Sequence, residues 1–105
     1  MATVIVAHMI AKKKRQIAKV LGSLEKFVCP ISLEVMREPV LAKDGHTYEL
    51  DMIRDWIERS GVSPYTRETL RVDDCVPNLT MKELIAELTI KLHQHCQDLQ
   101  QLESI

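Results

Sequence analysis

The fold of this chain is decided by Cys29-Pro30-Ile31-Ser32 and by Ser63-Pro64-Tyr65-Thr66-Arg67, together with the segment between them. Proline has no N–H group to donate, and it disfavours helical backbone at the residue that precedes it. Both stretches are therefore predicted to be irregular loops. The residues that separate them must supply the regular structure on which the two loops are held.

That intervening segment predicts a hairpin followed by a helix. Residues 40–42 and 47–48 can pair as short strands, and Asp44-Gly45 supplies the turn because glycine tolerates the positive φ that a tight turn needs. Residues 50–59 place apolar side chains on one helical face, and Gly61 is a natural helix terminator. The members of that face are Ile53, Trp56 and Ile57.

Longer helices are predicted on either side of this segment. The pattern from Thr3 to Leu24 is helical, with an apolar stripe of Ile10, Ile17, Leu21 and Leu24 and with Lys12, Lys13 and Arg15 largely off it. A second helix is expected to begin at Met81, after a capping box formed by Thr80 and Glu83. Its apolar seam consists of Ile85, Leu88, Leu92, His95, Leu99 and Leu102. This seam is too long for a small domain to cover, so its distal half is expected to pack on the first helix or on a second copy of the chain.

Composition narrows the class of protein. The chain has 105 residues, enough for one small domain, and its 14 basic and 15 acidic residues leave a net charge of −1, which argues against bulk electrostatic binding to nucleic acid. Lys12 to Arg15 is interpreted as a solvated helix face, with a nuclear-import or anionic-surface patch as the alternative. The three cysteines form no C-x-x-C pair and indicate free thiols in an intracellular, cytoplasmic setting, with a nuclear one also open. No apolar stretch is long enough to span a membrane, and no membrane partner is expected.

Four short segments are spaced like the ligand-bearing segments of a RING finger, a zinc-binding domain. They are Cys29–Ser32, Asp44–Glu49, Met52–Trp56 and Ser63–Arg67. Eight ligand positions of that motif fall on Cys29, Ser32, Asp44, His46, Glu49, Met52, Ser63 and Thr66. Only Cys29 and His46 are of a type that structural zinc prefers, and a tetrahedral site needs four. We therefore expect no zinc and no other cofactor. The polar replacements are expected to bond across the same gaps, Ser32 with Glu49 at one former site and Asp44, His46, Ser63 and Thr66 at the other.

Loss of the ligands within this spacing resembles the U-box family, the metal-free relatives of RING fingers, which are E3 ubiquitin ligases. The resemblance covers roughly residues 25–92. It is carried by Phe27-x-Cys29-Pro30-Ile31, Met36-Arg37-Glu38-Pro39-Val40, Gly45-x-Thr47-Tyr48, Ile53-x-x-Trp56-Ile57, Pro64-x-Thr66-Arg67-x-x-Leu70 and Pro77-Asn78-Leu79-x-x-Lys82-x-Leu84-Ile85. Two sequence blocks look most like those of the chaperone-associated U-box ligases. They are Val35-Met36-Arg37-Glu38-Pro39 and Pro77-Asn78-Leu79-x-Met81-Lys82-Glu83.

The fold that this resemblance implies is α+β: a small zinc-free domain with a short hairpin, a central helix and two loops, flanked by terminal helices. The expected organisation is a helix over residues 1–24, a U-box domain over 25–92 and a helical extension over 93–105. The implied activity is that of an E3 ubiquitin transferase, which binds a ubiquitin-charged E2 and promotes transfer to a substrate lysine without a covalent E3 intermediate.

The resemblance also implies which residues meet the E2. Ile31 is the expected apolar anchor, supported by Leu33, with Trp56 and Pro64 completing the surface; the alternative for Ile31 and Trp56 is burial in the core. Arg67 follows the last former ligand position, where the family keeps a basic residue that bridges E2 and ubiquitin, so it is the expected catalytic residue. The alternative is an ordinary surface arginine. The cysteines are interpreted as buried or incidental thiols, and His46 as a structural donor to the loop around Ser63 and Thr66.

Two other functions compete with this interpretation. A U-box scaffold without catalytic activity would use the helices to assemble a complex, but it would not need Ile31, Pro64 and Arg67 together. Binding of nucleic acid through Lys12 to Arg15 lacks aromatic platforms and a sustained basic face, so no nucleic-acid partner is expected. The helices also suggest a homodimer, because their seam leaves apolar surface exposed in a single copy.

Overall fold

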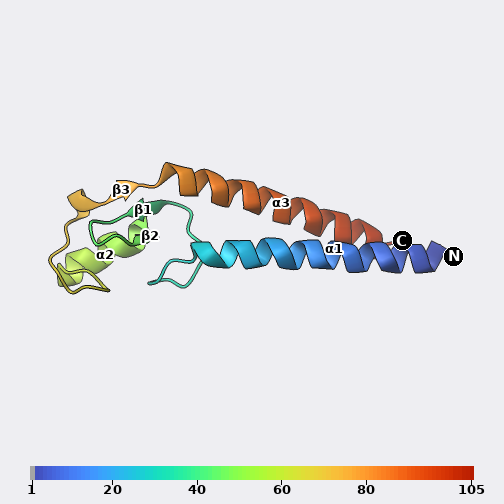
Figure 1. The fold of residues 1–105 in the computed structure, drawn as a ribbon, viewed down its shortest axis with the longest axis horizontal. Helices are drawn as coiled ribbons and strands as arrows, with labels where there is room; N and C mark the ends of the chain where they lie inside the picture. Colours follow the sequence, from blue (N-terminus) through green and yellow to red (C-terminus); the bar gives the residue numbers. More distant parts are fainter. Residues whose placement is uncertain (1) are drawn as a thin grey trace. The chain divides into compact units, whose positions relative to one another are not determined.

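The computed structural model describes residues 2–105 (Figure 1), and its architecture is the α+β class that the sequence predicted. The chain divides into two compact units. Phe27–Ile85 form the first, which we call the sheet unit, and the residues up to Lys26 together with Ala86–Ile105 form the second, the helical unit. In chain order the helices and strands are α1 (Ala2–Leu24), β1 (Pro39–Leu41), β2 (Thr47–Glu49), α2 (Leu50–Ser60), β3 (Val76–Pro77) and α3 (Leu79–Glu103), with 3-10 turns at Glu25–Phe27 and Val72–Asp74.

The sheet unit is built on three short antiparallel strands in the order β2-β1-β3. The predicted hairpin is confirmed: β1 pairs with β2, and Gly45 in the turn between them has a φ of 85°. Strand β3 was not predicted, because two residues carry no periodic signal. It forms through tertiary pairing, in which Val40 of β1 lies opposite Pro77, and the N–H of Asn78 donates to the carbonyl of Pro39 at 2.8 Å.

Helix α2 follows β2 without a break and ends at Ser60, one residue beyond the predicted range and directly before the predicted terminator Gly61. Gly61 adopts the left-handed conformation at φ 70°, and its N–H donates to the carbonyl of Ile57. Ile53 on this helix is fully buried, whereas Trp56 and Ile57 are half-buried. The core of the sheet unit comprises Cys29, Met36, Val40, Ala42, Tyr48, Ile53, Leu70 and Ile85, with Ser63 as a buried polar residue.

Helix α3 begins two residues earlier than the sequence predicted. Its first residue is Leu79, and the side-chain oxygen of Asn78 accepts a hydrogen bond from the N–H of Met81 at 3.1 Å. Asn78 therefore caps the helix, and the predicted capping box at Thr80 and Glu83 is wrong. Both Asn and Thr are good capping residues, but pairing of Asn78 with β1 holds the chain in position for the helix to start at once.

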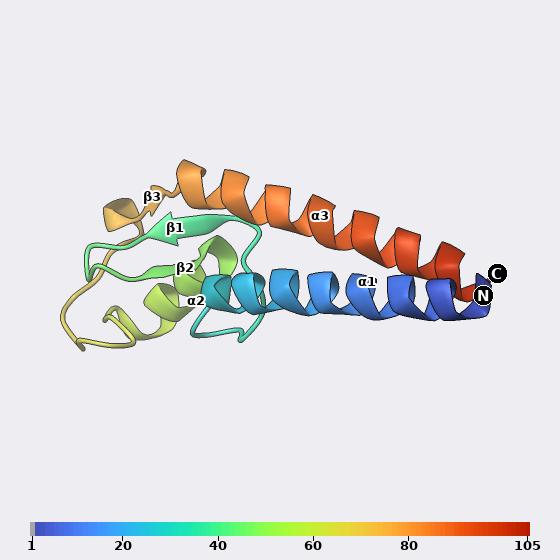
Figure 2. The ribbon, with the colours of Figure 1, turned by 45° about the vertical axis from the view of Figure 1, so that its right-hand side comes forward.

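The helical unit consists of α1 and the distal part of α3, which run side by side in opposite directions in both views (Figures 1 and 2). The predicted helix from Thr3 to Leu24 is confirmed. The ammonium group of Lys13 lies 3.2 Å from the carboxylate of Asp98 and 3.3 Å from Nδ1 of His95 on α3. Of the two predicted partners for the distal α3 seam, the first helix is the one found in this chain.

The packed face of α1 differs from the predicted stripe, because it lacks Leu21 and adds Val6, Lys13 and Val20. We call it the inner face, and its members are the least exposed residues of the helix at alternating steps of four and three: Val6, Ile10, Lys13, Ile17, Val20 and Leu24. Leu21 is exposed and does not belong to it, whereas Lys13 does, since Asp98 offers the ammonium group a partner there. No helix in the described part of the chain has both the length and the apolar character that crossing a bilayer requires.

Candidate functional site

The first loop of the sheet unit is closed by backbone hydrogen bonds around Cys29. The N–H of Cys29 donates to the carbonyl of Glu34, and the N–H of Leu33 donates back to the carbonyl of Cys29, both at 2.8 Å. An isolated bridge between Val28 and Val35 closes the base of the loop. The tip that contains Ile31 is therefore held rigidly outside the regular structure.

The second loop repeats this pattern around Ser63. The N–H of Ser63 donates to the carbonyl of Glu68 at 2.8 Å, and the N–H of Arg67 donates to the carbonyl of Ser63 at 3.1 Å. A bridge between Val62 and Thr69 closes its base. The two loops share a sequence pattern: a proline directly follows the first residue, and a hydroxyl residue lies three positions after that first residue. This pattern produces the same backbone conformation twice.

Leu33 and Arg67 occupy the same place in these two loops, and both have left-handed backbone. Their φ angles are 60° and 65°, the only positive values at non-glycine residues among residues 2–105. An L-residue in this region costs about 1 to 2 kcal/mol. Leu33 is also 76% exposed, so burial does not offset that cost. Strain and exposure together at an apolar side chain point to a partner surface.

A shallow groove lies next to the first loop, between its tip and α2. Its volume is about 320 Å³, and Ile31, Met52, Asp55, Trp56, Arg59 and Ser60 line it. The indole Nε1–H of Trp56 donates to the carbonyl of Val62 at 2.9 Å, which fixes the ring between α2 and the second loop. Apolar side chains from a loop and a helix thus face one hollow, as a partner's projecting side chain would require.

The structure places the sequence-predicted site residues in two groups. Ile31 and Trp56 line the groove together, and both are half-buried. Leu33, Pro64 and Arg67 are not among its lining residues; Leu33 belongs to the first loop, and Pro64 and Arg67 belong to the second loop. Pro64 is half-buried and Arg67 is exposed.

The sequence analysis missed the contribution of α2 to the groove. Met52, Asp55 and Arg59 lie at steps of three and four on the exposed side of the helix, which is the spacing that could have revealed them. Arg59 and Asp55 also form an ion pair at 3.0 Å. The rim of the groove therefore carries both charges around an apolar floor.

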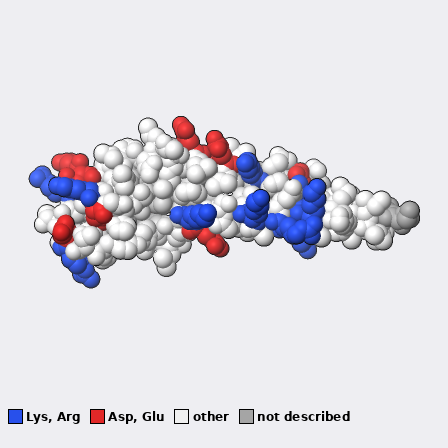
Figure 3. Space-filling model, viewed as in Figure 1, with Lys and Arg blue, Asp and Glu red and all other residues white. Residues whose placement is uncertain are grey.

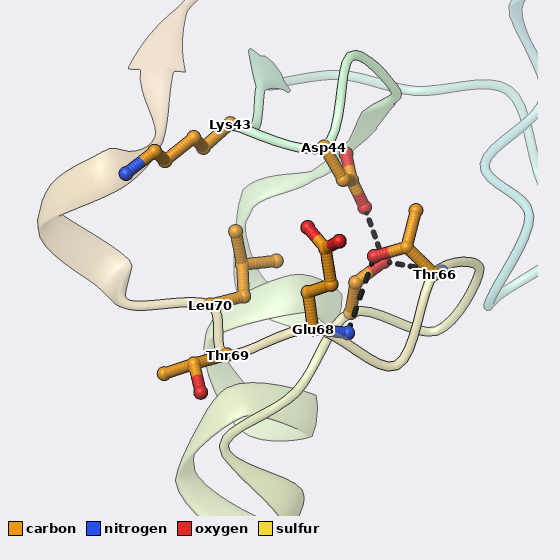
Figure 4. Close-up of a pocket in the computed structure, with 7 residues that line it drawn as sticks. Lys43, Asp44, Thr66, Glu68, Thr69 and Leu70 are labelled. Atoms are coloured by element: carbon orange, nitrogen blue, oxygen red, sulfur yellow. Dashed lines mark hydrogen bonds between the residues drawn. The ribbon is translucent and has the colours of Figure 1, made fainter.

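A polar network connects the hairpin to the second loop. Oδ2 of Asp44 accepts hydrogen bonds from Oγ of Ser63 at 2.6 Å and from the hydroxyl of Tyr48 at 2.5 Å. Oγ of Ser63 in turn accepts from the N–H groups of Tyr65 and Thr66, at 3.1 and 3.0 Å. Figure 4 shows Asp44 and Thr66 beside the polar cavity, of about 170 Å³, next to this network. These bonds join Asp44, Ser63 and Thr66, which stand at one set of ligand positions in the RING spacing.

The network shifts the pKa values of the Asp44 carboxyl group and of the Tyr48 phenol. Partial burial alone would raise the pKa of Asp44, but hydrogen bonds from Ser63, Tyr48 and the N–H of His46 outweigh it and hold that pKa below its ordinary value. The pKa of Tyr48 is raised strongly, first by burial and then by its bond to the Asp44 carboxylate. Near neutral pH the carboxylate is therefore charged and the phenol keeps its proton.

Two details of the predicted network are wrong. The Thr66 side chain does not bond to Asp44: its Oγ1 accepts from the N–H of Glu68 at 3.3 Å, and only its backbone joins the network. His46 was predicted to donate a hydrogen bond to the second loop. It instead stacks its ring on Tyr65 of that loop, with the ring centroids 3.9 Å apart. The conformation of the second loop turns the N–H of Thr66, not its hydroxyl, toward Ser63.

The other former metal site is bridged by Glu49. Its carboxylate accepts from the N–H groups of Arg37 and Glu38, the latter at 2.8 Å, and its own N–H donates to the sulfur of Cys29 at 3.3 Å. The predicted bond from Ser32 to Glu49 is wrong, because Oγ of Ser32 accepts from the N–H of Glu34 within its own loop. In the described part of the chain, no group of three His, Cys, Asp or Glu side chains is arranged to hold a metal ion.

The amino-acid sequence is similar to those of known proteins. The family model for the U-box domain matches residues 24–94. U-box domain-containing protein 12 of Arabidopsis thaliana is 45% identical over 64 residues, which are 60% of this chain and 10% of that protein. U-box domain-containing protein 4 of the same plant is 48% identical over 64 residues, 60% of this chain and 8% of that protein. The probable bifunctional E2/E3 enzyme R795 of Acanthamoeba polyphaga mimivirus is 44% identical over 64 residues, 61% of this chain and 5% of that protein. The chain thus spans a tenth or less of the length of these relatives.

Proposed function

The chain belongs to the U-box family, and from this premise we propose that it is an E3 ubiquitin-protein ligase module that binds a ubiquitin-charged E2. One observation carries the proposal. Leu33 is 76% exposed in a strained conformation, two residues after Ile31, which lines a groove together with Trp56. A buried core has no use for an apolar side chain in this position, whereas an interface does.

The proposed docking surface consists of Ile31, Leu33, Trp56 and Pro64. Ile31 and Trp56 are apolar lining residues of the groove, and Leu33 is exposed in the same loop as Ile31. Pro64 shapes the second loop, which the indole of Trp56 holds through the carbonyl of Val62. Because the loops are closed by backbone bonds, little conformational entropy is lost when an E2 binds.

The proposed chemistry needs no nucleophile on this chain. Holding the E2 and its ubiquitin in one arrangement lets a substrate lysine attack the thioester with less orientational freedom to lose. Two of the three cysteines agree with this role: Cys29 is fully buried and its sulfur accepts a hydrogen bond, and burial raises the pKa of the Cys75 thiol. A thiol of raised pKa is a poor nucleophile at neutral pH.

Arg67 is the residue that we propose acts on the reactive geometry. Its side chain is exposed, and its left-handed backbone sets the direction in which it leaves the second loop. A guanidinium group has several fixed donors and can bond carbonyl groups of two proteins at once. In this proposal Arg67 bonds both E2 and ubiquitin and so favours the reactive arrangement.

Two single variants test the proposal by separating binding from activation. Ile31→Ala is expected to weaken affinity for uncharged E2 by about 1 to 3 kcal/mol, as for an interface anchor, and to slow ubiquitin transfer accordingly. Arg67→Ala is expected to leave that affinity nearly intact and to slow discharge of the E2 thioester to free lysine. Arg37→Ala, another exposed arginine of the sheet unit, is the matched control and should change neither quantity.

Calorimetry with a panel of uncharged E2 proteins and single-turnover discharge measure the two effects. Equal loss in both assays for Arg67→Ala would reduce this residue to a docking contact. If no E2 of the panel bound the native chain, the ligase proposal would fail. The competing function, a scaffold that uses the U-box fold only for assembly, would then be the better one.

A further inference from the structure

The side of α1 opposite its inner face is a continuous exposed stripe. We call it the outer face, and it consists of Val4, Ile5, His8, Lys12, Arg15 and Lys19, all of them exposed. Successive members are mostly three or four residues apart, which places them along one side of a helix. The inner face packs within the helical unit, so the outer face is the side of α1 that α3 leaves open.

The charge on this helix has one sign only. Residues Ala2–Leu24 include five basic residues and no acidic one. The ion pairs found among residues 2–105 involve Lys13, Arg54, Arg59 and Lys82, so Lys12, Lys14, Arg15 and Lys19 have no carboxylate partner there. Like charges three and four residues apart destabilise a helix. An anionic partner would remove that repulsion.

The apolar end of the outer face narrows the choice of partner. Val4 and Ile5 are 72% and 58% exposed, about two helical turns before Lys12, the first lysine or arginine of the helix. Figure 3 shows the blue atoms of this helix gathered over its middle, with uncharged surface toward its N-terminal end. Nucleic acid would use the cations but not exposed aliphatic side chains. Aliphatic side chains that adjoin a basic stripe on one helix face are typical of a helix that lies on a membrane.

We propose that the outer face of α1 binds an anionic membrane surface, with Lys12, Arg15 and Lys19 at the lipid headgroups and Val4 and Ile5 inserted among them. The helix lies in the interface and does not cross it. The sequence analysis expected no membrane partner and interpreted this basic run as a solvated face, because the run by itself does not reveal which of its residues share a side with Val4 and Ile5. The proposal does not depend on ligase activity.

Co-sedimentation of the 105-residue chain with vesicles tests it, without any E2 present. Vesicles of phosphatidylcholine with about 30 mol% phosphatidylserine should bind the chain, and pure phosphatidylcholine should bind it at least about 10-fold more weakly. Raising the salt from about 0.1 M to about 0.5 M should remove most of the binding. This salt series uses only the native chain, so it remains decisive if a variant folds poorly.

Two variants separate the contribution of the basic side chains to vesicle binding from that of the inserted apolar side chains. Lys12→Gln, Arg15→Gln and Lys19→Gln combined should lower the partition coefficient by about 100-fold. The matched control replaces the same number of exposed cations in the sheet unit, Arg37→Gln, Lys43→Gln and Arg71→Gln, and should keep most of the binding. Val4→Gln with Ile5→Gln should lower it by about 10-fold without changing the salt dependence.

Three outcomes would overturn the proposal. They are equal binding of the native chain to neutral and anionic vesicles, no binding to anionic vesicles at about 0.1 M salt, and equal loss in the two triple variants. A chain that ignored the vesicles but bound an RNA duplex at the same salt would assign the outer face to nucleic acid instead.

Discussion

Oγ of Ser63 donates a hydrogen bond of 2.6 Å to Oδ2 of Asp44, and this bond joins the second loop to the hairpin at a position where the RING spacing predicts two metal ligands. Ser63 is almost completely buried. A buried hydroxyl bonded to a carboxylate is costly to leave without its partner. The pair therefore holds the second loop and the hairpin together.

The energetic coupling of this pair can be measured in a double-mutant cycle. Asp44→Ala and Ser63→Ala should each lower the free energy of unfolding by about 1 to 3 kcal/mol. The double variant should lose clearly less than the sum, because each single change already breaks the shared bond. Urea denaturation gives the values. Thr66→Val is the matched control: paired with Asp44→Ala it should be additive, since the Thr66 hydroxyl bonds only within its own loop.

Acid should destabilise the chain through Asp44. Its pKa is lower in the folded chain than the ordinary value of about 3.9, so the unfolded chain binds protons more readily. The stabilisation is therefore fully present above about pH 5 and is lost as the pH falls through the folded pKa. Asp44→Asn should show a weaker loss of Tm between about pH 5 and pH 2 than the native chain. An unchanged acid dependence would mean that other carboxylates dominate it.

Alkali should also destabilise the chain, through Tyr48. The pKa of this phenol is raised in the fold, first by burial, so its contribution to stability is present below the unfolded value of about 10 and is lost above it. Tyr48→Phe should remove this part of the alkaline dependence of Tm, at the cost of the bond to Asp44 at neutral pH. Tyr65→Phe, which changes an exposed phenol of the second loop, is the control.

Folding is predicted to be independent of zinc. At one former site Asp44 and Ser63 bond to each other, and at the other the Glu49 carboxylate is occupied by two N–H groups. Elemental analysis of the purified chain should find no stoichiometric zinc, and a chelator should leave Tm unchanged. One tightly bound zinc per chain would contradict both the prediction and its structural reason.

Leu33 should matter for E2 binding and hardly at all for stability. Its side chain is 76% exposed, so Leu33→Ala removes little buried surface and should leave Tm within the error of the measurement. Affinity for E2 should fall by about 1 to 3 kcal/mol. Leu79→Ala, which shortens an exposed leucine at the start of α3, is the control and should alter neither quantity. An unchanged affinity in Leu33→Ala would remove this residue from the docking surface.

The helical unit is predicted to support a homodimer. A groove of about 360 Å³ remains open in it, lined by Met9, Lys13, Asp98, Gln101, Leu102 and Ile105. Apolar side chains there can bury surface against a second copy. Sedimentation equilibrium at tens of micromolar should report a dimer, and Leu102→Asp should shift it to monomer. A monomer mass for the native chain at that concentration would show that α1 alone satisfies the apolar seam of α3.

Much of this protein could be predicted from local sequence. The hairpin, α1, α2 and the terminator Gly61 follow from side-chain periodicity and from backbone preferences that act over a few residues. The ordered set of short motifs was enough to identify the family. The candidate docking residues Ile31, Leu33, Trp56, Pro64 and Arg67 were also available at this level, and their roles remain predictions.

The tertiary structure alone decided how those parts are joined. It placed Ser63, and not Thr66, on the Asp44 carboxylate, and it directed Glu49 to the N–H groups of Arg37 and Glu38. It also made Asn78 the cap of α3 through the pairing of β3. Hydrogen-bond partners depend on the direction of each group within a folded loop, to a fraction of an ångström, and residue type and spacing do not contain that direction.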